Sequence, residues 1–272
     1  MIRLLVDPPQ GGVRNMAVDE AIMRSAAARG SVTLRFYEWS PGCLSFGRNQ
    51  SARGAYDPER ARQRGIDVLR RPTGGRAVYH HRELTYAVAA PADTWGSLRS
   101  AYCRLNRALA AGLLELGIPA ECTGDAPAGP RGSPPRRAPP PSAEACFRDP
   151  LPGEVTAAGR KLVGSAQWRD GGALLQHGSL LLVDEQHVVD ELRVVDASRS
   201  GPSTGHAPTG AAAVAEFCSV LPTTEDLVGA LRAGFGAEFS VLPDPGELTA
   251  AEETAAASLE ARYLDPGWTW RR

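Results

Sequence analysis

The chain has 272 residues, of which 43% are hydrophobic and 22% charged, and its formal net charge is -1. This composition is typical of a folded globular protein and offers no broad positive surface to nucleic acid. No run approaches the roughly 20 apolar residues of a membrane span, and the N-terminal segment lacks the apolar core of a signal peptide. We therefore expect a cytoplasmic monomer that binds neither nucleic acid nor membrane.

The cysteines and the single lysine restrict the chemistry further. The five cysteines are scattered without a C-x-x-C pair or zinc spacing, which favours reduced thiols over a disulfide framework or a metal site. Among the 30 basic residues only Lys161 is a lysine. A lysine offers a compact ammonium with an adjustable pKa, so this position is a candidate functional residue, although chance survival stays open.

The first half of the chain predicts several short strands and three helices. In chain order we expect a helix over 15–28 with Asn15 as its N-cap, strands over 32–39 and 44–46, a helix over 57–63 and a strand over 67–71. After a glycine-rich turn at 72–75, the segments 77–79 and 84–89 predict the two arms of a hairpin. The longest helical pattern covers 97–116 and stops at Gly117.

The second half begins with a segment rich in proline and arginine at 124–143, for which we expect a disordered loop. Three strands are predicted over 154–158, 162–169 and 173–183, and two helices over 223–235 and 247–263. We expect a single domain over residues 1–272, with 221–272 as a helical C-terminal part. The fold class is α+β, or mixed α/β, with a partly antiparallel sheet flanked by helices.

The first segment that can carry chemistry is RRPTGGRAVYH at 70–80. Two adjacent glycines after a strand let the backbone approach a ligand closely, and arginine beside them can bind a carboxylate or phosphate. A tight turn with solvated arginines is the alternative. The segment is not a P-loop, because it lacks the G-x-x-x-x-G-K-[ST] pattern.

The second feature is a cysteine, Cys146, that precedes the single lysine, Lys161, by a short stretch of chain. Most free cysteines are buried and inert. A nearby ammonium, however, stabilises thiolate over thiol, lowers the pKa of a cysteine and supplies a nucleophile at neutral pH. We therefore predict Cys146 and Lys161 as catalytic residues.

Small residues in two neighbouring predicted strands form the third feature. Gly164, Ser165 and Ala166 lie in one strand, and Gly178 and Ser179 lie in the next. Such strands can line a narrow slot for an extended acyl chain, although a sheet core with glycines at bends explains them too. His177 can orient a carbonyl or shuttle a proton, or can serve as a structural histidine bonded to backbone.

In this order, RRPTGGRAVYH, ELTYAV, ACF, GRKLVGSAQ and LQHGSLLL resemble the lipoate–protein ligase and octanoyltransferase superfamily. A cysteine placed before the GRK lysine is similar to the Gram-positive type of octanoyltransferase. The resemblance implies a catalytic domain like that of biotin and lipoate–protein ligases. It also implies that octanoyl passes from acyl carrier protein to Cys146, and from there to the lysine of a lipoyl domain such as the glycine cleavage H protein.

By the same resemblance, Lys161 lowers the pKa of Cys146, and no cofactor or metal is required. Arg71, Gly74, Gly75 and His80 match the loop of the acyl pocket. The complete set of residues that we predict to bind substrate is Arg71, Thr73, Gly74, Gly75, Ala77, His80, Gly164, Ser165, Ala166, Gln176, His177, Gly178 and Ser179.

Three other functions stay open at this point. An ATP-dependent lipoate–protein ligase would use Lys161 to contact an acyl-adenylate and leave Cys146 idle. An amidotransferase would move octanoyl or lipoyl between lipoyl domains. A non-catalytic module would bind lipoyl domains without forming an acyl-enzyme.

Overall fold

The computed structural model describes residues 1–122, 147, 152–194 and 210–271. The predicted loop at 124–143 and the predicted nucleophile Cys146 lie outside these residues. The strands are β1 (Ile2–Val6), β2 (Val32–Tyr37), β3 (Cys43–Phe46), β4 (Asp67–Arg70), β5 (Val78–His80), β6 (Glu83–Pro91), β7 (Ala120–Cys122), β8 (Val155–Ala157), β9 (Arg160–Asp170), β10 (Ala173–Leu181) and β11 (Asp244–Pro245). The α-helices are α1 (Gly12–Arg29), α2 (Pro58–Gln63), α3 (Leu98–Glu115), α4 (His187–Glu191), α5 (Thr224–Phe239), α6 (Ala250–Leu264) and α7 (Pro266–Thr269).

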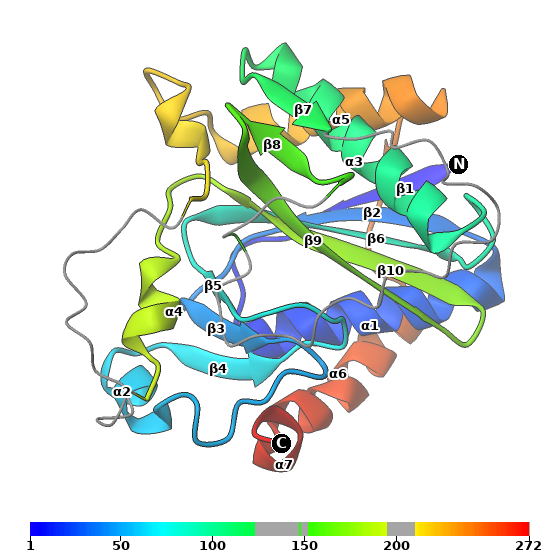
Figure 1. Cartoon of the computed structure of the whole chain (residues 1–272). Coiled ribbons are helices and arrows are strands. Elements are labelled where there is room, and N and C mark those ends of the chain that lie inside the picture. The colour runs from blue at the N-terminus through cyan, green and yellow to red at the C-terminus, as the bar shows by residue number, and fades with distance from the viewer. Residues whose placement is uncertain (123–146, 148–151, 195–209, 272) are drawn as a thin grey trace, which may run out of the picture.

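Two mixed sheets form the frame of the molecule (Figure 1). The eight-stranded sheet has the order β11-β1-β2-β6-β10-β9-β8-β7, and the three-stranded sheet has the order β4-β3-β5. In the large sheet β1 and β2 are parallel, whereas β6, β10, β9 and β8 are joined by antiparallel pairings. The predicted α+β class with a partly antiparallel sheet is confirmed.

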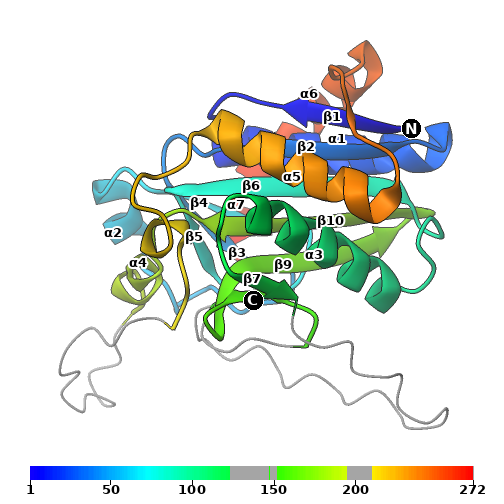
Figure 2. The ribbon, with the colours of Figure 1, turned by 90° about the horizontal axis from the view of Figure 1, so that it is seen from above.

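Helices cover both faces of the large sheet, and Figure 2 shows α3 and α5 on one of them. Successive side chains of a strand point to opposite faces, so one strand serves both cores. From β2, Leu34 and Phe36 pack with α3 and α5, whereas Tyr37 packs with α1 and α6. A third core lies against the small sheet around Phe46.

The predicted hairpin between residues 77 and 89 is wrong. β5 pairs with β3 in the small sheet, whereas β6 pairs with β2 and β10 in the large sheet. The two segments are neighbours in sequence, but they lie in different sheets and do not pair with each other. This crossing from one sheet to the other brings His80 and the start of β6 to the space between the sheets.

Most helix starts follow from capping residues in the sequence. Asp57, Ser97 and Thr223 each accept hydrogen bonds from backbone N–H groups of the first turn. The prediction for Asn15 is wrong, because α1 begins earlier, with Gly11 at the N-cap. Asn15 is buried instead, and its side-chain oxygen accepts a hydrogen bond from Arg35.

The elements predicted for the second half of the chain are present, and one helix is longer than predicted. The two predicted helices are present as α5 and α6, and α5 continues to Phe239. The three predicted strands of the second half are present as β8, β9 and β10. The short helix α4 was not predicted, because five residues are too few for a helical periodicity to stand out.

Candidate active site

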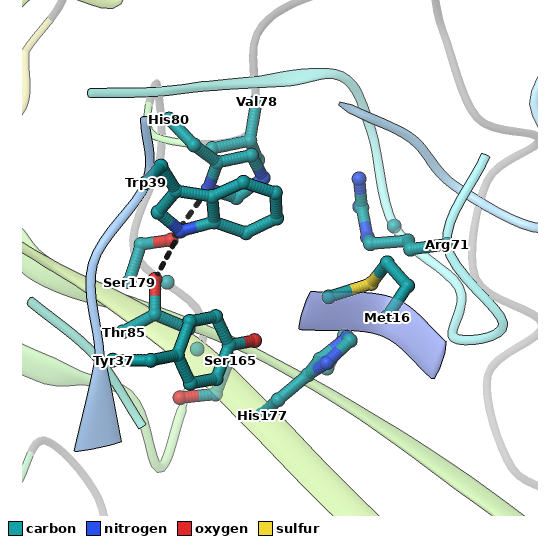
Figure 3. Close-up of a pocket in the computed structure, with 14 residues that line it drawn as sticks. Met16, Tyr37, Trp39, Arg71, Val78, His80, Thr85, Ser165, His177 and Ser179 are labelled. Atoms are coloured by element: carbon teal, nitrogen blue, oxygen red, sulfur yellow. Dashed lines mark hydrogen bonds between the residues drawn. The ribbon is translucent and has the colours of Figure 1, made fainter. Parts of the chain in front are cut away.

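A buried pocket lies between the two sheets, beside α1 (Figure 3). Its empty volume, which includes space open to solvent at the mouth, is about 430 Å³. Gly75 is exposed and Gly164 to Ala166 are half-buried, so these residues mark the mouth. The other lining residues are buried: Met16, Tyr37, Trp39, Arg71, Val78, His80, Thr85, His177, Gly178 and Ser179.

The carboxylate of Asp19 organises one part of the pocket floor. Asp19 is fully buried and accepts hydrogen bonds from Arg35 Nη1 at 2.7 Å, Tyr37 Oη at 2.8 Å and His177 Nδ1 at 2.9 Å. Burial alone would raise the pKa of Asp19, but the bond from His177 and the charge of Arg35 lower it. Asp19 is therefore an anion that fixes the rings of Tyr37 and His177.

These bonds also define the protonation state of His177. Burial lowers the pKa of the imidazole from 6.5, although Asp19 opposes the shift. A neutral ring that donates from Nδ1 to an anion must accept at Nε2. The partner at Nε2 is the hydroxyl of Thr73 at 2.6 Å, which therefore donates.

A second buried carboxylate, Glu83, organises the opposite wall. Its Oε1 lies 2.8 Å from His80 Nδ1, 2.6 Å from Thr85 Oγ1 and 2.7 Å from Ser179 Oγ. Trp39 donates from Nε1 to Thr85 at 2.7 Å, and its ring stacks on His80 with centroids 4.1 Å apart. Because these polar atoms bond to one another, the wall presents mainly ring and carbon surface to the pocket.

Two glycines allow β9 and β10 to form the mouth. The strands pair antiparallel with Gly178 opposite Ser165 and Ser179 opposite Gly164. A Cβ atom at Gly178 would lie 2.5 Å from the carbonyl oxygen of Gly164, and one at Gly164 would lie 2.7 Å from the ring of Phe147. Side chains at these two positions would therefore disturb both the strand pairing and the packing of Phe147.

Lys161 lies on β9 in a buried ion pair with Glu154. Lys161 Nζ and Glu154 Oε1 are 2.6 Å apart, and their side chains are 3% and 5% exposed. The ammonium also lies over the ring of Phe147, 5.4 Å from its centroid. Phe147 is the residue after Cys146, and its ring also contacts Gly164 at the pocket mouth.

Many of the residues predicted to bind substrate line this one pocket: Arg71, Gly75, His80, Gly164, Ser165, Ala166, His177, Gly178 and Ser179. Others lie behind it. Thr73 bonds to His177, and the carbonyl of Gly74 accepts from Arg71. Ala77 packs in the core of the small sheet. Gln176 points to the opposite face of β10, where its amide donates to Tyr86 and Asn106.

Sequence reasoning missed Met16, Tyr37, Trp39, Val78 and Thr85 as lining residues. For Tyr37 a signal exists, since the alternation in β2 separates it from Leu34 and Phe36 on the other face. Asp19 and Glu83 were missed too, because an acidic residue in a helix or strand reads as a solvated side chain. Glu154 was missed for the same reason.

Within residues 1–122, 147, 152–194 and 210–271, no group of three or more His, Cys, Asp or Glu side chains is arranged to hold a metal ion. In the same part of the chain, no helix combines the length and apolar character that a membrane crossing requires.

Solved structures with the same fold identify the class of protein. A crystal structure of lipoate-protein ligase A bound with ATP superposes with a TM-score of 0.75 at 24% identity, covering 98% of both chains. A bi-partite lipoate protein ligase from Thermoplasma acidophilum gives a TM-score of 0.75 at 25% identity, covering 98% of this chain and 95% of that one. The chain thus has the fold of the catalytic domain of lipoate–protein ligases.

The family follows from sequence. The family model described as "Lipoyl protein ligase A/B catalytic domain" matches residues 12–236, so this chain belongs to that family. The octanoyltransferase LipM of Symbiobacterium thermophilum is 38% identical over 276 residues, covering 99% of this chain and 98% of that protein. Octanoyltransferase LipM of Moorella thermoacetica is 38% identical over 267 residues, covering 95% and 93%. The resemblance found in the motifs is confirmed.

Proposed function

We propose that this chain is an octanoyltransferase of protein lipoylation, which carries octanoyl as a thioester on Cys146 to a lysine of a lipoyl domain. One observation carries the proposal. Lys161 packs over the ring of Phe147, the residue after Cys146, and that ring lies beside Gly164, which lines a pocket with largely apolar walls. The full-length similarity to octanoyltransferases supports the acyl group and the acceptor class.

The reaction has two balanced steps. The Cys146 thiolate attacks the thioester of octanoyl-acyl carrier protein, a new carbon–sulfur bond forms, and the carrier leaves as a thiolate that takes up a proton. This exchange of one thioester for another needs no ATP. The uncharged amine of the acceptor lysine then attacks the enzyme thioester, the bond to Cys146 breaks, and a stable amide forms.

The pocket suits the acyl chain in this scheme. The hydroxyl of Tyr37, the indole N–H of Trp39 and the imidazole of His177 all bond to buried neighbours rather than facing inward. An octanoyl chain can therefore lie against ring and carbon surface without breaking these hydrogen bonds.

Intact-mass spectrometry after incubation with octanoyl-acyl carrier protein tests the thioester directly. The wild-type protein gains ~126 Da, the mass of one octanoyl group, and Cys146→Ala gains none, because its nucleophile is missing. Cys218→Ala, a half-buried cysteine that packs against the core beneath α3 and α5, is the matched control and gains the same mass as wild type. Full transfer to a lipoyl domain by Cys146→Ala would refute the mechanism.

The same assay separates the other functions. Turnover that requires ATP and free acid would assign the chain to the ligases, whose fold it shares. An adduct formed from octanoyl-H protein but not from octanoyl-acyl carrier protein would assign it to the amidotransferases. We place the reaction in the cytoplasm, where cysteine thiols stay reduced.

A further inference from the structure

A turn of backbone places Glu154 opposite Lys161. Glu154 directly precedes β8, Lys161 lies at the start of β9, and Thr156 of β8 pairs with Lys161 across the hairpin. Asn106 of α3 donates to the carbonyl of Gly153 at 2.6 Å, and Gly153 has a φ of 92°, a conformation that favours glycine. The approach of the carboxylate is thus fixed by the backbone as well as by the ion pair.

The pair is nearly closed to solvent. The side chains of Lys161 and Glu154 are 3% and 5% exposed. Burial disfavours the charged form of an amine, and an isolated lysine in such a place tends to lose its proton. A carboxylate at 2.6 Å reverses this tendency, because breaking a buried pair leaves an uncompensated charge.

We propose that Glu154 keeps Lys161 an ammonium throughout the catalytic cycle, so that this lysine works as a fixed hydrogen-bond donor and cation and not as a base. The inference rests on the proposed function for its chemical meaning. The Cys146 thiolate is present only in the free enzyme, since it is consumed when the acyl-enzyme forms. Glu154 is a counter-charge that remains in both states. Glu154 is accordingly a positioning residue, which acts through Lys161.

Other ionisable groups around the pair fit this assignment. Tyr86 of β6 senses the same carboxylate: burial, with a smaller contribution from the Glu154 charge, raises the pKa of its phenol to about 12. Tyr86 therefore stays neutral and does not replace Glu154. Arg160, beside Lys161 in the sequence, pairs with Glu216 at the surface.

The proton balance of the second step follows. The acceptor lysine must lose two protons from its ammonium to become an amide nitrogen. One leaves to solvent before the attack, and the other leaves to solvent as the tetrahedral adduct collapses and Cys146 departs as a thiolate. Lys161 neither takes up nor releases a proton in either step, whereas a general base would accept a proton from the acceptor amine and release it later.

The single lysine makes the inference directly measurable. Protein grown with lysine labelled by ¹³C at Cε has one labelled side chain, Lys161, and so one resonance to follow against pH. We expect the wild-type resonance to keep its ammonium position up to about pH 9. In Glu154→Gln the midpoint of the titration falls by about two pH units or more, because the carboxylate that lies 2.6 Å from the buried amine is removed.

Two further variants keep the test decisive. Glu154→Asp retains the charge and leaves the resonance in its ammonium position at neutral pH. Glu121→Gln removes an exposed carboxylate from the neighbouring strand β7 and leaves the midpoint where it is in wild type. A wild-type resonance that titrates below about pH 8, or equal midpoints in wild type and Glu154→Gln, overturns the proposal. Should Glu154→Gln not fold, the wild-type and Glu154→Asp titrations decide.

The titration requires no acyl donor. If it succeeds while Cys146→Ala retains transfer activity, the proposed thioester fails and the charge assignment stands. If the octanoyl adduct forms but Lys161 titrates near neutrality, the proposed function stands and Lys161 is a base.

Discussion

Two buried carboxylates in this protein bind different types of cation. Asp19, behind the pocket floor, binds Arg35 together with the neutral donors Tyr37 and His177. Glu154, which directly precedes β8, binds the ammonium of Lys161. Both are buried, and both approach their cations closely, but the identity of the cation differs.

This difference indicates a structural role for the Asp19 cluster and a chemical role for Lys161. A guanidinium remains protonated in proteins, so the charge of the Asp19 cluster is constant and the cluster serves to orient the rings above it. An ammonium can lose its proton when its environment changes. The protein places its single lysine against Phe147, the residue after the proposed nucleophile in the sequence, and uses arginine in the Asp19 cluster, where a constant charge is sufficient.

The strongest test of this difference is to replace Lys161 with arginine, so that both carboxylates bind a guanidinium. Lys161→Arg keeps the charge but replaces a compact ammonium with a larger planar group beside Glu154 and Phe147. We expect acyl-enzyme formation to slow by roughly 100-fold, because the donor no longer fits its position. Rapid-quench mass spectrometry of the octanoyl adduct measures the rate.

Arg160→Lys is the control for this substitution. It makes the reverse exchange at the adjacent position, whose side chain is 39% exposed and pairs with Glu216. We expect a wild-type rate, since a surface pair contributes little. Equal rates in wild type and Lys161→Arg would show that charge alone suffices at this position, and the contrast with Asp19 would lose its meaning.

A second test concerns the strand pairing that joins the two clusters. β10 carries His177, which contacts Asp19, and pairs with β9, which carries Lys161. Gly178→Ala would place a Cβ 2.5 Å from the backbone oxygen of Gly164. We expect a loss of about 1–3 kcal/mol in the free energy of unfolding, because the backbone must shift. Urea unfolding measures it.

Gly229→Ala is the matched glycine control. Gly229 lies inside α5, and a Cβ there would meet no atom within 4 Å. The free energy of unfolding should rise by about 0.5–1 kcal/mol, because alanine restricts the unfolded chain more than glycine does. A similar loss in both variants would mean that the close approach of β9 and β10 is not the cause.

The smallest effect is expected from His177, and it depends on pH. Burial lowers the pKa of folded His177 below 6.5, so in this range the unfolded chain binds more protons. The resulting contribution to stability is complete above about pH 6.5 and is lost as the pH falls toward the folded pKa. His177→Asn keeps a donor for Asp19 and removes the titration, so its unfolding free energy should decline less between pH 6.5 and 5.

Urea unfolding at several pH values measures this slope. The pKa of Asp19 is also lowered, from 3.8, and its contribution has the same sign but falls at more acidic pH, outside the window. Parallel profiles for wild type and His177→Asn would contradict the neutral state that we assign to the imidazole.

Local patterns explain how much of the fold was predictable. Helix starts at Asp57, Ser97 and Thr223 depend on a side chain and a backbone N–H a few residues away, so the sequence carries the whole interaction. The strand pair β9 and β10 follows from alternation around a short turn. β5 and β6 were assigned to one hairpin for the same local reason, and here a distant strand, β3, was the better partner.

The candidate site divides along the same line. Some motifs consist of residues that are close in sequence, and these line the pocket as predicted: Gly164 to Ala166 and His177 to Ser179. The charges behind the wall did not emerge from sequence. From sequence alone an Asp or Glu is expected to be exposed to solvent. Asp19, Glu83 and Glu154 are instead buried by residues that are distant in sequence.

The sequence by itself determined the family, the fold class, most strands and helices, and the special standing of the only lysine, because each of these depends on composition or on neighbours along the chain. Only the tertiary structure decided which faces of β2, β6 and β10 enclose the pocket and which carboxylate meets Lys161. The reason is physical: burial and pairing of charge arise between residues far apart in the chain, and they exist only once the sheets and helices have packed.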